Sequence, residues 1–147
     1  MAYKAIIFDL DGTILDTLQD LANSLNHALR THGYPERSLD EVRRFIGNGI
    51  KMLVRRGCPA DTSEEALEAA LATFRVHYDA HCKDFTGPYE GIHALLDSLL
   101  ESGIRTAVVS NKSNLRSSCC VMSTSPESSN TWSGTAPIWH PSPPPTP

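Results

Sequence analysis

The sequence of 147 residues lacks the features that mark secreted, membrane or polyanion-binding proteins. Basic residues do not predominate: 13 Lys and Arg against 17 Asp and Glu give a net charge of −4, so no positive field favours nucleic acid or anionic lipid. No apolar run approaches the ~20 residues that a membrane span needs, and no apolar signal segment follows the first methionine. The four cysteines have neither zinc-site spacing nor the density of a disulfide framework. We therefore expect a cytoplasmic protein with reduced thiols that binds neither membranes nor nucleic acid.

Charged residues are scarce after Lys112, where the composition of the chain changes. Residues 113–147 contain nine Ser, four Thr and seven Pro, and only Arg116 and Glu127 are charged. The proline-rich end lacks amide donors for a helix or a central strand, and it has little apolar surface to offset the entropy of ordering. We expect residues 113–147 to be a disordered tail, although both tryptophans lie in it.

The first 112 residues have the pattern of an α/β fold. Apolar runs at residues 5–8 and 104–109 predict two parallel strands that are buried on both faces. The segment between them has capping pairs, glycine stops and apolar residues at helical spacing. The helices are expected from Thr17 to Gly33, from Ser38 to about Ile46, from Gly49 to Arg56, from Thr62 through Tyr78, and from Gly91 to Ser102.

Local signals give these helices their expected starts and inner faces. The capping pairs are Thr17 with Asp20, Ser38 with Glu41, and Thr62 with Glu65. The apolar residues expected to face inward on the last helix are Ile92, Leu95, Leu96 and Leu99. The order of elements indicates an α/β core (residues 1–16 and 87–112) that carries an α-helical cap (residues 17–86) inserted after the first strand.

Two carboxylates follow the first predicted strand directly, in Asp9-Leu10-Asp11-Gly12-Thr13. The carboxyl ends of parallel strands form the ligand crevice of an α/β sheet, and carboxylates two residues apart can divide nucleophile and proton-transfer roles around a cation. An Asp-rich turn with a helix cap explains the same residues, because Asp-Gly is also a common turn. Ser110-Asn111-Lys112 ends the second strand and would emerge at the same edge; alone, it is typical of a turn.

The two segments become specific when they are taken with the residues between them. The matching segments are Asp9-Leu-Asp11-Gly-Thr13-Ile-Leu-Asp16-Thr17, then Pro88-Tyr89-x-Gly91 before a helix, then Val108-Val109-Ser110-Asn111-Lys112. Together they resemble the haloacid dehalogenase-like phosphohydrolases, and within them the phosphoglycolate phosphatase group, over roughly residues 3–112. This resemblance implies a Rossmann-like core with an incomplete parallel sheet and a small helical cap.

The resemblance also implies roles for the matching residues. Asp9 would be the nucleophile that forms an aspartyl-phosphate, and Asp11 would protonate the leaving alcohol and later activate water. Asp9 and the backbone carbonyl of Asp11 would hold Mg²⁺. The phosphoryl oxygens would be bound by Gly12, Thr13, Ser110 and the backbone of Asn111. A dianionic substrate can approach a carboxylate only if a cation and hydrogen-bond donors compensate for the repulsion.

In the cap, residues 45–49 resemble the loop that phosphoglycolate phosphatase-like proteins turn toward the active site. Asn48 is the candidate substrate contact there, because its amide offers both a donor and an acceptor. A helix C-cap followed by an N-cap explains Gly47 and Gly49 equally well. The cations Arg43, Arg44, Lys51, Arg55 and Arg56 could draw anions, although such a face is more often merely solvated. The histidines of residues 27–93 have no spacing that suggests a metal site, and Cys58 and Cys82 are expected to pack.

Two further motifs of the family are not found after residue 112: a Lys in Lys-Pro-x-Pro, and a late acidic pair for Mg²⁺. Residues 142–147 are what the codons AAG CCC GCC CCC GAC CCC give when translated from their second nucleotide, and the first frame encodes Lys-Pro-Ala-Pro-Asp-Pro. The same shift over residues 126–134 permits a segment that resembles the family before its Lys. We interpret this as a reading frame lost between about Lys112 and Ser118.

The favoured function is Mg²⁺-dependent hydrolysis of a small phosphate monoester, with 2-phosphoglycolate as the best single substrate, in a chain that is inactive in this truncated form. A phosphomutase of the same fold is the enzymatic alternative. A non-enzymatic truncated product is the alternative from another class.

Overall fold

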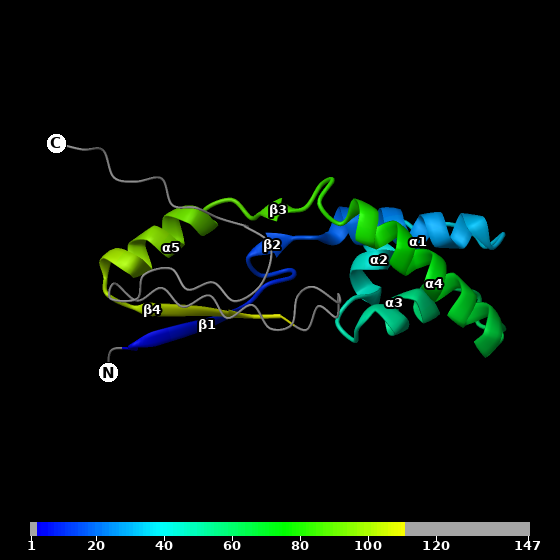
Figure 1. The fold of residues 1–147 in the computed structure, drawn as a ribbon, viewed down its shortest axis with the longest axis horizontal. Coiled ribbons are helices and arrows are strands. Elements are labelled where there is room, and N and C mark those ends of the chain that lie inside the picture. The colour runs from blue at the N-terminus through cyan, green and yellow to red at the C-terminus, as the bar shows by residue number, and fades with distance from the viewer. Residues whose placement is uncertain (1–2, 111–147) are drawn as a thin grey trace.

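The computed structural model describes residues 3–110, which form two groups of elements (Figure 1). The elements are, in order, β1 (Ala5–Asp9), β2 (Leu15–Asp16), α1 (Leu18–Thr31), α2 (Leu39–Phe45), α3 (Ile50–Gly57), α4 (Glu64–His81), β3 (Gly87–Pro88), α5 (Ile92–Glu101) and β4 (Arg105–Val109). Strands β1 and β4 lie with α5 at one end, and the cap helices α1–α4 lie at the other, with β2 and β3 between them (Figure 1). The predicted α/β fold with a helical insertion is confirmed. The tail of residues 113–147 lies outside the described residues.

Strands β1 and β4 pair in parallel, in a register that runs from Ala5 opposite Arg105 to Asp9 opposite Val109. Parallel pairing requires a crossover connection, and here the crossover contains the whole cap and α5. The two strands therefore end together at one edge. This register places the residues that follow Asp9 and Val109 next to each other.

The expectation that both strands are buried on two faces is wrong for the described residues. Ile7 is 71% exposed and Val109 is 44% exposed. Helix α5 packs against β4, and a small cluster of Ile14, Leu15 and Val108 lies nearby. One helix can cover only one face of a two-stranded sheet, so the side chains on the other face stay accessible.

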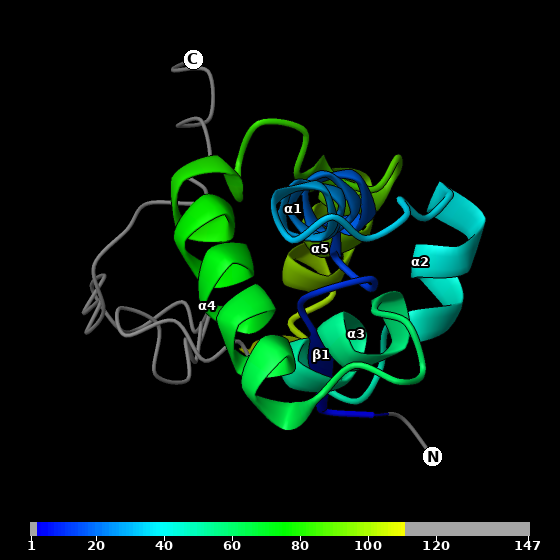
Figure 2. The same ribbon diagram turned by 90° about the vertical axis from the view of Figure 1, so that its right-hand side faces the viewer.

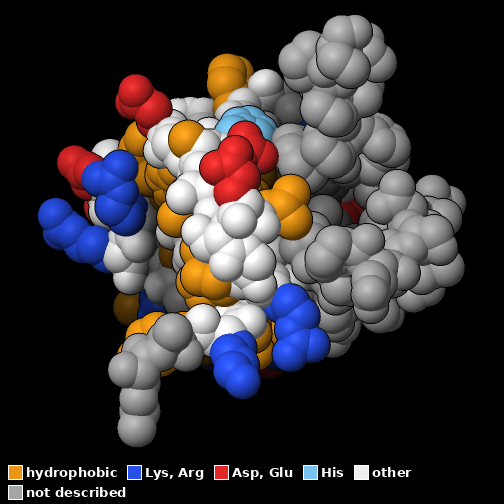
Figure 3. Space-filling model, turned by 90° about the vertical axis from the view of Figure 1, so that its left-hand side faces the viewer, with side chains coloured by type: hydrophobic (Ala, Val, Ile, Leu, Met, Phe, Trp, Pro, Cys, Tyr) orange, Lys and Arg blue, Asp and Glu red, His pale blue; other side chains and the backbone are white. Residues whose placement is uncertain are grey.

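Helix α5 forms as predicted, but its apolar face is less buried than expected. None of its residues is fully buried, and Leu95 is 43% exposed instead of facing inward. Figure 3 shows hydrophobic side chains on the surface at this end of the molecule. The helix has apolar residues at helical spacing, but too little sheet lies beneath it to cover them all.

The main hydrophobic core lies in the cap, where α1 and α4 pack side by side against α2 and α3 (Figure 2). Its buried residues are Ala22, Leu25, Ala28, Leu29, Val42, Leu53, Val54, Cys58, Leu67, Ala70, Leu71, Phe74 and Tyr78. Cys58 is buried and Cys82 is half-buried, and both are free thiols that pack as expected. Burial of this much apolar surface is the dominant favourable term in folding the cap.

One of the three predicted capping pairs is present in the structure, and the other two are not. Ser38 and Glu41 form the predicted capping box at α2. Helix α4 begins with Ser63 as its N-cap, which accepts a hydrogen bond from the Ala66 amide, so the expected pair at Thr62 is displaced by one residue. Thr17 precedes α1 without a side-chain cap bond, and the Asp20 carboxylate binds Phe85 and Thr86 instead.

Asp20 ties the two connections between the strands and the cap. It is only 2% exposed and accepts hydrogen bonds from the Phe85 amide and from both the amide and the hydroxyl of Thr86 (2.7–3.2 Å). Next to it, β2 and β3 form a short antiparallel pair that the sequence did not predict. Both connections are therefore held together where the chain enters and leaves the cap.

Within residues 3–110, no helix is both long enough and apolar enough to cross a membrane.

Candidate active site

The turn after β1 is organised around Leu10. Its carbonyl accepts hydrogen bonds from the amides of Ile14 and Leu15, both at 3.0 Å, and the Gly12 amide donates back to the Leu15 carbonyl at 2.8 Å. Gly12 has a φ of +77°, a conformation that favours glycine because residues with a Cβ are strained there. The turn therefore keeps Asp9 and Asp11 at the strand end and returns the chain toward the cap.

The two predicted motifs meet across the parallel pair. The Ser110 hydroxyl donates a hydrogen bond to Asp11 Oδ2 at 3.3 Å, although the residues are 99 positions apart in the sequence. The register of β1 and β4 brings this about, because Asp9 lies opposite Val109, immediately before Ser110. The expected convergence at one edge of the sheet is therefore present in the structure.

Asp9 lies exposed at the carboxyl end of β1. Its Oδ1 accepts a hydrogen bond from the Leu10 amide at 2.8 Å, which fixes the orientation of the carboxylate. Thr13 is exposed on the same turn, so its hydroxyl is accessible to a ligand. Asn111, the other predicted phosphate contact, lies outside the described residues, as does Lys112.

The cap turn with Asn48 is held by Arg56 near the end of α3. The Arg56 guanidinium donates to the Phe45 carbonyl at 2.7 Å and to Asn48 Oδ1 at 2.9 Å. Figure 1 shows the turn between α2 and α3 on the part of the cap that points toward the carboxyl end of β4. Asn48 is exposed, so its amide group is accessible.

Several of the other cap cations are paired with carboxylates of the cap itself. These ion pairs are Arg43–Asp40, Lys51–Glu64, Lys51–Glu68 and Arg55–Glu64. The hydrogen bonds from Lys51 and Arg55 hold the pKa of Glu64 below its ordinary value. Exposed pairs of this kind contribute little stability. They also leave these cations less available to an anionic ligand than Arg56, whose acceptors are neutral.

Oxygen donors at the strand end fit a hard cation such as Mg²⁺. The Asp9 carboxylate and the Asp11 carbonyl are the two predicted protein ligands, and Mg²⁺ often takes few protein oxygens and keeps several waters. In residues 3–110, no group of three or more His, Cys, Asp or Glu side chains is arranged to hold a metal ion.

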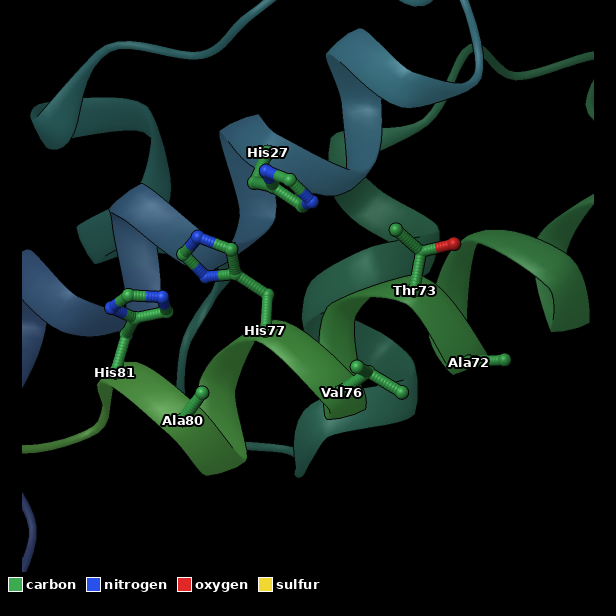
Figure 4. Close-up of a pocket in the computed structure, with 7 residues that line it drawn as sticks. All are labelled: His27, Ala72, Thr73, Val76, His77, Ala80 and His81. Carbon is green, nitrogen blue, oxygen red and sulfur yellow. The ribbon is translucent and has the colours of Figure 1, made fainter.

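Sequence reasoning missed two features of the cap. It assigned Asp20 to a helix cap, whereas the carboxylate binds the returning connection. It also treated the histidines separately, whereas His27, His77 and His81 stack and line a hollow of about 520 Å³ between α1 and α4 (Figure 4). The spacing of His77 and His81, four residues apart on one helix, was the available signal. Among the described residues, neither the turn of residues 9–13 nor Ser110 lines this hollow.

A carboxylate pair at the end of a parallel strand, followed directly by a helical insertion, places the chain among α/β proteins with a capped site. The model of the haloacid dehalogenase-like hydrolase family matches residues 6–123, so the chain belongs to that family.

Relatives with known names are similar over the same part of the chain. A phosphoglycolate phosphatase of Agrobacterium fabrum is 34% identical over 112 residues, covering 74% of this chain and 48% of the relative. One from Aquifex aeolicus is 37% identical over 109 residues, covering 74% of this chain and 49% of the relative. The chain thus spans about half the length of the curated relatives it matches.

Solved structures agree with this assignment. A predicted phosphoglycolate phosphatase from Haemophilus somnus 129PT superposes with a TM-score of 0.67 at 32% identity, covering 74% of this chain and 52% of that one. A putative phosphoglycolate phosphatase from Lactobacillus delbrueckii gives a TM-score of 0.69 at 34% identity, covering 78% of this chain and 57% of that one. The fold is therefore shared with the strand-and-cap half of these proteins.

Proposed function

We propose that the chain carries the nucleophile half of a Mg²⁺-dependent phosphatase site that hydrolyses a small phosphate monoester. The observation that carries this proposal is the hydrogen bond between Ser110 and Asp11, which joins the two motifs at the edge where both strands end. A turn that merely capped a helix would have no need of a hydroxyl from a strand so distant in the sequence.

The proposed roles follow from the position of each group. An oxygen of the Asp9 carboxylate attacks phosphorus, and the bond between phosphorus and the alcohol oxygen breaks, which leaves an aspartyl-phosphate. Asp11 gives its proton to the departing alcohol and then takes a proton from the water that attacks the phosphoryl group. Ser110, together with Thr13, Gly12 and the backbone of Asn111, is proposed to hold the phosphoryl oxygens.

Mg²⁺ is the proposed cofactor, and Asp9 and the carbonyl of Asp11 are the residues that would hold it. When bound, the ion supplies positive charge that offsets the repulsion between the substrate phosphate and the Asp9 carboxylate. The exposure of Asp9 leaves its second oxygen accessible for that contact.

The cap turn supports an acidic substrate such as 2-phosphoglycolate. Arg56 can only donate, so the atom of Asn48 that faces it must be the amide oxygen. The Asn48 NH₂ group is then directed away from Arg56 as a donor, which suits a carboxylate oxygen better than a hydroxyl hydrogen. The names of the relatives support the same substrate.

We further propose that the 147-residue chain turns over slowly or not at all by itself. The sequence after Lys112 contains no lysine to neutralise the phosphate and the nucleophile, and only one carboxylate, Glu127. A non-enzymatic product is favoured by this same observation. A phosphomutase remains the enzymatic alternative, and it differs by producing an isomer instead of free phosphate.

Phosphate release tests both statements. A frame-restored chain, made by correcting one nucleotide near codon 112, should release phosphate from 2-phosphoglycolate with Mg²⁺, and Asp9→Asn should abolish the release because an amide is a poor nucleophile. Asp61→Asn, an exposed change in the cap, is the matched control and should retain activity. The uncorrected chain should stay at background.

Each result that contradicts the proposed function would point to a different conclusion. Release that persists in the restored chain with Asp9→Asn would place the nucleophile elsewhere. Release by the uncorrected chain at a comparable rate would show that the missing lysine and carboxylate are dispensable. Isomer formation without phosphate release, measured with a phosphate monoester that carries a second hydroxyl, would support the phosphomutase.

A further inference from the structure

Three imidazole rings form a continuous stack between the two longest cap helices. The ring centroids of His27 and His77 lie 4.1 Å apart and those of His77 and His81 lie 4.3 Å apart, each pair with an interplanar angle of 26°. Figure 4 shows His27 projecting from α1 toward His77 and His81, which project from α4. The rings therefore bridge the interface between α1 and α4.

Hydrogen bonds fix two of these rings. His77 Nδ1 lies 3.0 Å from the hydroxyl of Ser24, which is completely buried on α1. His81 Nδ1 lies 2.8 Å from Asp84 Oδ2, just beyond the end of α4. The middle ring is thus attached to the opposite helix, whereas the outer ring His81 is paired with a carboxylate.

Protonation of this stack would bring like charges together. The ring of His81 pairs with Asp84 on one side and stacks on His77 on the other. Positive charges on two neighbouring rings would lie about 4 Å apart in a partly buried site, where repulsion is screened less than in water. The neutral stack therefore suits the packed cap, and the multiply charged stack opposes it.

The surroundings of His77 mainly oppose its protonation. Burial, followed by the charges of His27 and His81, holds the pKa of His77 below its ordinary value of 6.5. Asp84 partly offsets this effect, and Arg30 of α1 adds to it.

We propose that the stack of His27, His77 and His81 is a pH-sensitive clasp between α1 and α4 that weakens the cap when the solution is acidified. The unfolded chain takes up a proton at His77 near the ordinary value, whereas the folded chain resists it until a lower pH. The stabilising effect is therefore complete above about pH 6.5 and is lost as the pH falls below that value. The clasp would act whether or not the chain is a phosphatase.

Urea unfolding of the full chain, followed by its helical circular dichroism between about pH 7.5 and pH 5.5, tests the clasp. The equilibrium constant for unfolding of the wild-type chain should rise as the pH falls. The total rise is about tenfold for each pH unit by which folding lowers the pKa of His77. His77→Gln should reduce this pH dependence. His93→Gln makes the same chemical change on α5, outside the stack, and should retain it.

Equal pH dependence in His77→Gln and His93→Gln would overturn the proposal, as would a wild-type chain with no loss of stability in this range. If His77→Gln does not fold, the assigned Cε1–H resonance of His77 in the wild-type chain decides instead. A midpoint below the ordinary histidine value supports the clasp, and a midpoint at or above that value refutes it.

Discussion

Asp20 is a buried carboxylate whose partners come from the far end of the cap. Backbone amides of residues 85 and 86 and the Thr86 hydroxyl all donate to it, so its charge is compensated by three donors. A charged group at 2% exposure is tolerated only with such compensation. Asp20 lies in the first turn of α1, shortly after β2, and its partners come just before β3, so it joins the two connections of the cap.

Asp20→Asn should lower the free energy of unfolding by about 2 kcal/mol, because hydrogen bonds to a charged acceptor are lost and an NH₂ group is brought against amide donors. Urea unfolding measures this loss. Asp40→Asn is the control, since Asp40 is exposed and pairs only with Arg43 among the described contacts. That control should change stability by less than about 0.5 kcal/mol. Equal losses in the two variants would show that Asp20 is not a structural tie.

At the scale of elements, the close approach of α3 to α1 depends on Gly57. A Cβ added at Gly57 would lie 2.8 Å from Cδ1 of Leu25, a side chain that is fully buried in the cap core. Because Leu25 is surrounded by packed neighbours, it has little room to move aside. The last residue of α3 is thus a glycine for reasons of packing.

Gly57→Ala should therefore destabilise the cap by about 1–3 kcal/mol through overpacking, even though alanine is the better helix former. Gly87→Ala is the matched control, because a Cβ there meets no atom within 4 Å. Thermal unfolding of both variants compares the two sites. A Gly57→Ala variant as stable as Gly87→Ala would mean that Leu25 can change its rotamer without cost.

At the scale of the whole molecule, the cap is better packed than the strand region. Among residues 3–110, the cap has a core of thirteen buried residues, whereas the cluster beside β1 and β4 has three, and Ile7 is 71% exposed. Exposed apolar strands favour association between chains. Relatives that are about twice as long share this same half of the fold.

The frame hypothesis makes a prediction at this scale. We expect a one-nucleotide insertion or deletion in the DNA that encodes residues 112–118. When this change is corrected, the downstream DNA should encode the lysine and acidic motifs of the family. The frame-restored protein should also aggregate less than the 147-residue chain in size-exclusion chromatography, because further elements would cover the strands. A neighbouring frame without these motifs, or equal aggregation, would contradict the hypothesis.

The sequence by itself determined the main helices and the two parallel strands, and it predicted the candidate groups of the site. Helix α2 begins at Ser38 as predicted, and the parallel strands end where Asp9 and Ser110 follow. These features depend on local physics: side chains next to a helix start cap it, and parallel strands that are joined by a crossover present their carboxyl ends at one edge. The roles of Asp9, Asp11, Thr13 and Asn48 stay predictions that the proposed experiments address.

Tertiary structure alone decided how far each residue is covered and which side chains meet within the cap. Leu95 has the spacing of an inward residue but is 43% exposed, because burial depends on how much sheet lies beneath the helix. Asp20 has the position of a capping residue but binds Thr86, and Arg56 binds Asn48 from the far end of the next helix. Contacts of this kind depend on how helices pack in three dimensions, and no local pattern in the sequence encodes that packing. The contact of His27 with His77 has the same origin, because it exists only where α1 and α4 lie side by side, whereas His77 and His81 are neighbours on one helix.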